Sequence, residues 1–246
     1  MILDNIARAL KTQNWVAVAI EFIIVIVGVV IGFQVNAWNE TRQEAAAEAA
    51  FLVDLSNDVL LAEALTERLR ERRLARLDDV RSGLDTLFER NDRDQLSSEE
   101  CITIASGHYL NINVPGLIAF DELAGSGRVG IISDQRLKRD LTAYQQAREA
   151  LLWFMQLPGQ STHNLPRIFP ELIQNKGYFD TELEEIRSES VCDLAAMRAS
   201  PAFLTAASQN ADAYDAYVRD GLRPWSDQLT RVKQRLDELL AIRNSD

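Results

Sequence analysis

The sequence is poor in the two residues that interrupt helices, with 11 glycines and 6 prolines among 246 residues. Alanine, leucine, glutamate and arginine are abundant instead, and this composition favours helices over a β-sandwich or a β-barrel. Strand-like alternation of apolar and polar residues is also missing, and the sequence has no internal repeat. We therefore expect an all-α protein.

Residues that carry chemistry are equally scarce, with two histidines and two cysteines. A zinc site needs three or four closely spaced ligands, and neither His108 nor His163 has such neighbours. The stretch 125–130 has the G-x-G-x-x-G spacing of dinucleotide-binding loops, but that motif requires a strand before it and a helix after it. A helix is expected before this stretch and an extended segment at 129–132, so we interpret it as a helix cap and turn. The sequence thus predicts no metal, no cofactor and no enzymatic activity.

Basic residues are outnumbered by acidic ones, 26 against 37, which gives a net charge of −11. The charges within residues 1–37 cancel, so the whole excess lies in residues 38–246. A field of that sign repels polyphosphate and argues against nucleic-acid binding. One basic run interrupts the pattern, and we interpret it as a solvated helix face supported by i, i+4 ion pairs, with a docking surface for an acidic partner as the second interpretation. Its members are Arg68, Arg70, Arg72, Arg73 and Arg76.

One long hydrophobic run is present, and it begins at Trp15. It continues for 19 residues with Glu21 as its one ionisable side chain. At about 1.5 Å per residue it covers most of a hydrocarbon layer of about 30 Å. Trp15 and Trp38 bracket it at the positions that indole rings prefer in membranes. The sequence predicts a cytoplasmic segment over 1–14 and a transmembrane helix over 15–37.

The flanking charges predict the orientation of this helix. Arg8 and Lys11 precede the run, whereas acidic residues follow it with Arg42 as the one nearby base. Positive residues stay inside, so residue 38 onward is expected outside. The alternative is a cleaved signal peptide with its cleavage site at 35–37. We favour the anchor because the run is longer than the roughly 7–15-residue apolar core of such peptides.

Two glycines inside the run, Gly28 and Gly32, have the spacing that lets membrane helices approach closely. At 100° per residue Glu21 falls on the same stripe. An intramembrane carboxylate normally faces protein or water. We therefore interpret Glu21, Gly28 and Gly32 as a surface that packs against a partner helix, from a second copy or from another membrane protein. The alternative is that Glu21 reaches water at the cytoplasmic interface and that the glycine pair is fortuitous.

The membrane stretch resembles the opening of a bacterial family of single-pass proteins classified as domain of unknown function 6090. The residues that carry this resemblance are Ile20-Glu21-Phe22, Val25, Gly28-Val29, Gly32, Asn36 and Trp38-Asn39-Glu40. A looser similarity covers Phe120-Asp121-Glu122-Leu123, Ser126-Gly127-Arg128 and Ile131-Ile132. The resemblance implies an anchored helical domain. Together with the predicted orientation, we expect a bacterial inner-membrane protein with residues 38–246 in the periplasm. It implies no activity, ligand or site.

Three stretches after residue 50 carry apolar residues at steps of three and four, the pattern of helices with one buried face. The first covers 52–87 and has Arg73 in one slot of its apolar stripe, and the membrane helix is expected to continue into it unbroken. The second starts at a Ser133 cap and ends near Met155. Such faces cannot be buried alone, so we expect an antiparallel bundle.

The third long stretch starts at Ser200-Pro201, an N-cap followed by proline at the first helical position. It continues to about residue 239, with a kink or interruption expected at Gly221 and Pro224. Shorter helices are expected over 97–109, where Ser97 and Glu100 have the spacing of a capping box, and over 117–124. A further helix is expected from a capping box at Thr181.

The two cysteines, Cys101 and Cys192, would lie in an oxidising compartment if residues 38–246 are outside the inner membrane. Cysteines commonly pair there, so we predict a disulfide that closes a loop of roughly 90 residues. The alternative is a pair of buried free thiols.

Together these features predict a membrane-anchored, non-enzymatic helical interaction module. Its partners would be the lipid bilayer and a second copy or a membrane protein. The alternative is an extracytoplasmic bundle that senses a ligand between its helices. Such a sensor would need a membrane partner, because 14 cytoplasmic residues cannot provide an output. A pocket lined by convergent polar groups would favour the sensor, and a closed dry core the interaction module.

Overall fold

The computed structural model describes residues 15–156, 162–181 and 184–243, without the side chains of 15–18 and 185–188. The expected cytoplasmic segment 1–14 and the indole of Trp15 lie outside this part of the chain. The chain divides into two compact units, Met1–Phe51 and Leu52–Asp246.

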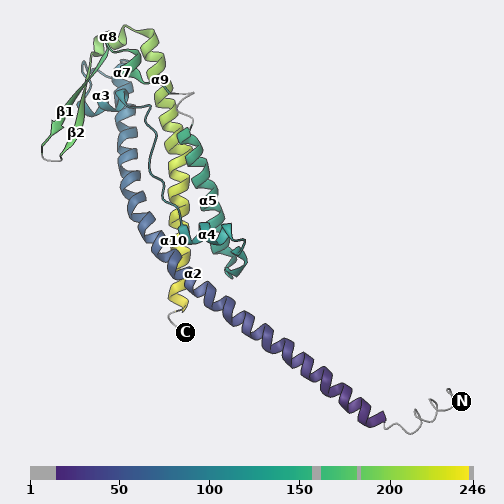
Figure 1. The fold of residues 1–246 in the computed structure, drawn as a ribbon. Coiled ribbons are helices and arrows are strands. Elements are labelled where there is room, and N and C mark those ends of the chain that lie inside the picture. The colour runs from purple at the N-terminus through teal and green to yellow at the C-terminus, as the bar shows by residue number, and fades with distance from the viewer. Residues whose placement is uncertain (1–14, 157–161, 182–183, 244–246) are drawn as a thin grey trace. The chain divides into compact units, whose positions relative to one another are not determined.

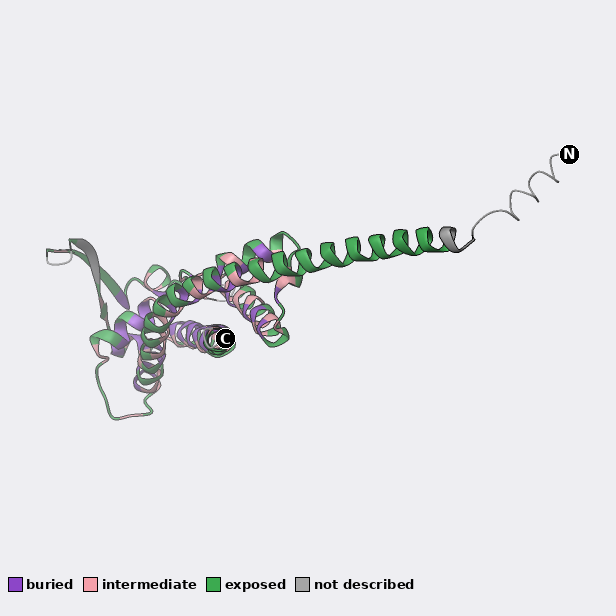
Figure 2. Cartoon of the chain, turned by 90° about the horizontal axis from the view of Figure 1, so that it is seen from below, coloured by how far each residue is buried: buried purple, intermediate pink, exposed green. Residues whose placement is uncertain are grey.

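The first described element is helix α2, Trp15–Leu87, and its length confirms that the apolar helix continues unbroken past residue 50. Within the first unit, every residue from 19 to 46 is exposed, as Figure 2 shows by the uniform green of this part of the ribbon. By length and composition, α2 contains one segment apolar enough to cross a membrane, and none of that segment is buried by protein.

The second unit is mostly helical, as expected, and Figure 1 shows its elements. The α-helices that follow α2 are α3 (Ser98–Ala105), α4 (Ile118–Gly125), α5 (Gln135–Gln156), α7 (Leu165–Ile168), α8 (Leu194–Arg198), α9 (Pro201–Ala216) and α10 (Arg223–Arg243). A 3-10 turn η1 (Val129–Ile131) precedes α5, and a π-helical segment η2 (Tyr217–Leu222) joins α9 to α10.

The helix starts follow local capping chemistry. Ser97 and Glu100 form the reciprocal capping box at the start of α3, and Ser200 caps α9 with proline at its first turn, as the sequence predicts. The helix expected from Ser133 instead begins after Asp134. The Asp134 carboxylate accepts a hydrogen bond from the Leu137 amide at 2.7 Å. The negative carboxylate is also attracted to the positive end of the helix dipole, and a neutral serine hydroxyl lacks this attraction.

The predicted interruption near Gly221 and Pro224 is confirmed by η2. Proline has no N–H to donate into the preceding turn, so the helix widens there. A Cβ added at Gly221 would lie 3.1 Å from a Leu151 side-chain carbon and 3.2 Å from a Phe154 ring carbon. The glycine therefore allows α5 to pack closely against η2.

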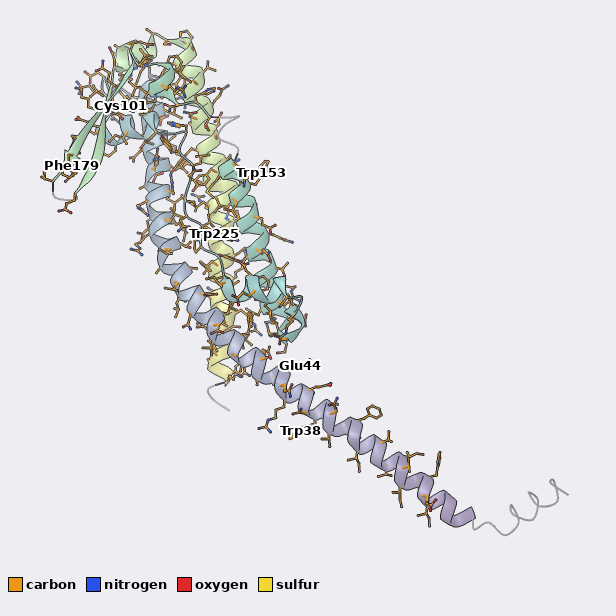
Figure 3. All side chains as sticks on the ribbon, viewed as in Figure 1. Trp38, Glu44, Cys101, Trp153, Phe179 and Trp225 are labelled. Carbon is orange, nitrogen blue, oxygen red and sulfur yellow. A yellow bond between two sulfur atoms is a disulfide. The ribbon has the colours of Figure 1, made fainter. Side chains whose placement is uncertain are left out.

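The second unit has one buried cluster around α3, α7, α8 and the start of α9, and it includes Ile173 at the base of the hairpin. Another core lies where α5 packs against α10 and η2. Its largest fully buried side chains include Trp225, Tyr144, Tyr214 and Tyr217, and Figure 3 labels Trp225 on α10. Burying one large apolar side chain stabilises a fold by roughly 1.5–3 kcal/mol. At the start of α5, Arg235 of α10 donates two hydrogen bonds to Asp134, at 3.0 and 2.5 Å. These bonds lower the pKa of Asp134 to about 2.

One element corrects the all-α expectation. Strand β1, Ile173–Asp180, pairs antiparallel with β2, Glu185–Cys192, in the register Ile173–Cys192 to Asp180–Glu185. The helix predicted from Thr181 is wrong, because Thr181 lies in the turn and Glu184 has a φ of 51°. Apart from Ile173 and the partly buried Asp180, β1 is exposed on both faces, so the strand has no alternation that the sequence could reveal.

The G-x-G-x-x-G stretch follows helix α4 rather than a strand, which agrees with the cap-and-turn interpretation. Gly127 has a φ of 71°, a conformation that favours glycine over residues with a Cβ. The extended segment expected at 129–132 is wrong, because Val129–Ile131 form the 3-10 turn η1.

A disulfide between Cys101 and Cys192 joins α3 to the end of β2, with Cα atoms 5.9 Å apart. An isolated two-stranded hairpin is only marginally stable in water. Here α3 packs against β2, and Figure 1 shows the hairpin extending away from α3. The disulfide therefore holds the base of the hairpin on the helices.

Replacing both cysteines with serine should lower the free energy of unfolding of the second unit. The bridge spans 91 residues, and a loop of that size contributes about 4–5 kcal/mol in the chain-entropy model. Urea unfolding of the full chain in lipid nanodiscs, followed by circular dichroism, measures the change. An unchanged urea midpoint, or alkylation of the wild-type chain without reductant, would contradict the bridge.

Candidate functional site

Helix α2 places three arginines of the basic run on one side of the second unit. Arg72, Arg73 and Arg76 are one and four residues apart, so they share a helix face. A cleft of about 440 Å³ lies beside them. We call it the arginine cleft, and it is lined by Leu65, Leu69, Arg72, Arg73, Arg76, Asn111, Ile112 and Asn113.

The second wall of the cleft is the segment 109–117, which has no regular secondary structure. Arg73 donates hydrogen bonds from its two terminal nitrogens to the carbonyls of Tyr109 at 3.3 Å and Asn111 at 2.9 Å. The Ile112 amide donates to the Met155 sulfur at 3.4 Å, and the Tyr144 hydroxyl donates to a further carbonyl of the segment at 2.9 Å. These bonds to α2 and α5 hold the wall against the two helices.

Two tyrosines at the end of α9 and the start of η2 support the arginines. The guanidinium of Arg73 lies 5.9 Å from the ring centre of Tyr217, and that of Arg76 lies 5.6 Å from that of Tyr214. Arg76 also donates to the Ser106 hydroxyl at 2.6 Å, and the Tyr214 hydroxyl donates to the Arg73 carbonyl at 3.2 Å. Cation–π contacts of this kind stabilise a partly desolvated guanidinium.

The electrostatics of the cleft are dominated by guanidinium charge. Burial lowers the pKa of Arg76, but an arginine side chain stays protonated in proteins. Burial raises the pKa of both Tyr214 and Tyr217, so both phenols are neutral. Burial, and then the charge of Arg76, lower the pKa of His108, which leaves its ring neutral at pH 7.

The three cleft arginines donate hydrogen bonds to carbonyl and hydroxyl oxygens rather than to carboxylates. Within the part of the chain that the structure describes, no carboxylate forms an ion pair with Arg72, Arg73 or Arg76. Arg70 by contrast pairs with Glu67 at 3.8 Å, and Lys233 pairs with Glu63 at 2.6 Å. Three cations therefore line a cleft in an acidic domain without an ion pair among the described residues. Asp79 is near enough to Arg76 for its charge to oppose the lowering of the Arg76 pKa by burial.

This arrangement is suited to binding an anion. A guanidinium offers a planar fork of N–H donors that matches a carboxylate or a phosphate. The cleft lining has no nucleophile beside a base, and the described residues contain no group of histidine, cysteine, aspartate or glutamate placed to hold a metal ion.

The residues singled out from the sequence lie elsewhere. Glu21, Gly28 and Gly32 are exposed on α2 in the first unit, and a Cβ added at either glycine would meet no atom within 4 Å. Cys101 and Cys192 form the disulfide at the hairpin base and do not line the cleft.

The spacing of the basic run predicts a solvated helix face for the cleft arginines, and the sequence pattern gives no signal for Asn111 or Asn113. One signal was present, since Arg73 occupies a slot in the apolar stripe of 52–87. An arginine at a position that faces other elements needs polar partners there, and the carbonyls of 109–111 supply them. No family model, curated protein or solved structure matches the chain, so the resemblance of the membrane stretch stays a prediction.

Acidification should destabilise the second unit through His108. Its pKa is lower in the folded state than the ordinary value of about 6.5, so the unfolded chain binds the proton first. The free energy of unfolding is therefore highest above about pH 6.5 and falls as the pH drops below that value. The variant His108→Asn should lose less stability than the wild type between about pH 7.5 and pH 5.5. Urea midpoints across that range test this, and equal slopes for the two chains would contradict it.

Proposed function

We propose that this protein is a membrane-anchored, non-enzymatic helical domain that binds an anionic ligand in the arginine cleft. The observation that carries the proposal is the absence of carboxylate partners for Arg72, Arg73 and Arg76 among the described residues, in a chain of net charge −11. An acidic surface repels anions, so a local group of unpaired cations supplies both attraction and selectivity for the ligand.

The anchor in this proposal is the helix over 15–37. The described residues of this segment from 19 onward are exposed on every side and mostly apolar, and lipid is the solvent that such a surface requires. Arg8 and Lys11 before the segment favour a cytoplasmic N-terminus and an extracytoplasmic domain from residue 38. We propose the bacterial inner membrane and periplasm, in keeping with the family resemblance, and an antiparallel bundle for α2 beyond Leu52, α5, α9 and α10.

Small anions test the ligand-binding function. Titrating inorganic phosphate and acetate into the full chain in zwitterionic lipid nanodiscs should shift the arginine side-chain NMR signals of the cleft in a saturable way. Arg72→Gln should raise the dissociation constants about tenfold, because charge-assisted hydrogen bonds contribute roughly 1.5–3 kcal/mol.

The matched control for this titration is Arg68→Gln. Arg68 and Arg72 each donate from Nε to the carbonyl four residues earlier, at 3.1 and 3.2 Å, but Arg68 does not line the cleft. The control should bind both anions as the wild type does. An equal loss of anion affinity in the two variants would mean that net charge alone explains the effect. That result would contradict an anion site at the cleft.

A second candidate function is association through the membrane helix. Gly28 and Gly32 have open space over their α-carbons, and Glu21 shares their stripe. The small residues permit close backbone contact, and a carboxylate in the hydrocarbon layer needs a polar partner. The partner in this proposal is a second copy of the chain or another membrane protein.

Cross-linking in native membranes tests this second function. The variant Glu21→Gln with Gly28→Leu and Gly32→Leu should lose most of the cross-linked species, because the bulky side chains separate the helices. The control is Val27→Leu with Val30→Leu, outside the stripe, and it should leave cross-linking intact. Unchanged cross-linking in the variant with the altered stripe would contradict association through this surface.

A further inference from the structure

The arginine cleft has an apolar end as well as a cationic one. Leu65 and Leu69 lie on α2 two turns and one turn before Arg73, and Ile112 lies on the opposite wall. Leu65 is 48% exposed. Eight residues separate Leu65 from Arg73, which is about 12 Å along the helix axis. Along α2, the cleft therefore presents apolar surface first and guanidinium groups after it.

From this arrangement we infer that the ligand of the arginine cleft is an amphiphilic anion, a carboxylate or phosphate headgroup that carries an apolar chain. The headgroup binds Arg72, Arg73 and Arg76, with the amides of Asn111 and Asn113 beside it. The chain lies over Leu65, Leu69 and Ile112. The inference rests on the ligand-binding function proposed above and specifies its chemical class.

The arginines are prepared for such a headgroup. Arg73 and Arg76 are already oriented by carbonyl, hydroxyl and tyrosine contacts, so little side-chain entropy is lost when they bind. Arg72 is held by one bond from Nε to the Arg68 carbonyl, which leaves its terminal nitrogens for the ligand.

The cleft also disfavours other ligand classes. Its lining residues include no carboxylate, so the ammonium group of a cation or an amino acid finds no counter-charge. They include no aromatic ring on which a nucleotide base could stack. The volume of about 440 Å³ is within the range of small-molecule pockets, roughly 300–1,000 Å³. A small inorganic anion would leave the apolar end in contact with water.

The test uses the full chain with methyl-labelled leucine and isoleucine in zwitterionic nanodiscs, titrated with hexanoate, acetate and hexylammonium. Hexanoate should bind at least tenfold more tightly than acetate and should shift the methyl signals of Leu65, Leu69 and Ile112. Hexylammonium should not shift them. Nanodiscs without protein correct for partition of the probes into lipid.

Two exposed leucines provide a matched pair of variants. Leu65→Ser should reduce the preference for hexanoate over acetate several-fold. Leu61→Ser, one turn earlier on α2 and 69% exposed, lies outside the cleft and should leave the preference unchanged. Both side chains are exposed, so neither change threatens folding. Arg72→Gln should weaken hexanoate and acetate alike.

The amphiphile can come from solution or from the membrane, and anionic lipid in the nanodisc distinguishes the two. Methyl shifts produced by anionic lipid without hexanoate would support the inference and identify membrane lipid as the source. Equal affinities for hexanoate and acetate would overturn the amphiphile while leaving anion binding in place. Absence of saturable binding by any anion would overturn both, and binding of hexylammonium as tight as hexanoate would overturn the charge selectivity.

Discussion

The cost of exposing a long apolar helix to water is the constraint on which the account of this protein depends. From residue 19 to residue 46, α2 has no protein packed around it, and the first part of this stretch consists almost wholly of valine, isoleucine, alanine and phenylalanine. A helix in lipid satisfies its backbone hydrogen bonds internally and places such side chains in a solvent that accepts them. The proposed anchor follows from that preference. The proposed orientation follows from Arg8 and Lys11, and the proposed oxidising environment of the disulfide depends on both.

The second unit combines two kinds of interior. Where α5 packs against α10 and η2, the contact is apolar and close, and the absence of a Cβ at Gly221 leaves room for Leu151 and Phe154. Beside the arginine cleft, polar groups occupy the interior instead. Desolvating Arg73 and Arg76 is unfavourable, and carbonyl oxygens, a serine hydroxyl and two tyrosine faces offset it. Partly burying a guanidinium without a carboxylate partner lowers the stability of the fold. Such a group is therefore a candidate for binding an anionic ligand.

Local chemistry explains which features could be predicted from the sequence. The capping box at Ser97, the serine–proline start of α9 and the interruption near Gly221 each depend on a few neighbouring residues. The hairpin could not be predicted, because β1 is exposed on both faces beyond Ile173 and its stability comes from α3 and the distant Cys101. The cleft was also beyond sequence reasoning, because its second wall, 109–117, has no periodic pattern. It is positioned by bonds from Arg73 and Tyr144, 36 and 29 residues away.

The most direct measurement of the central claim is the intact mass of the chain that stays on membranes washed in alkaline carbonate, which removes proteins without an anchor. The account requires a mature chain that still contains residues 15–37 and remains with the lipid. A chain that begins at Trp38, or one recovered in the soluble wash, would contradict it.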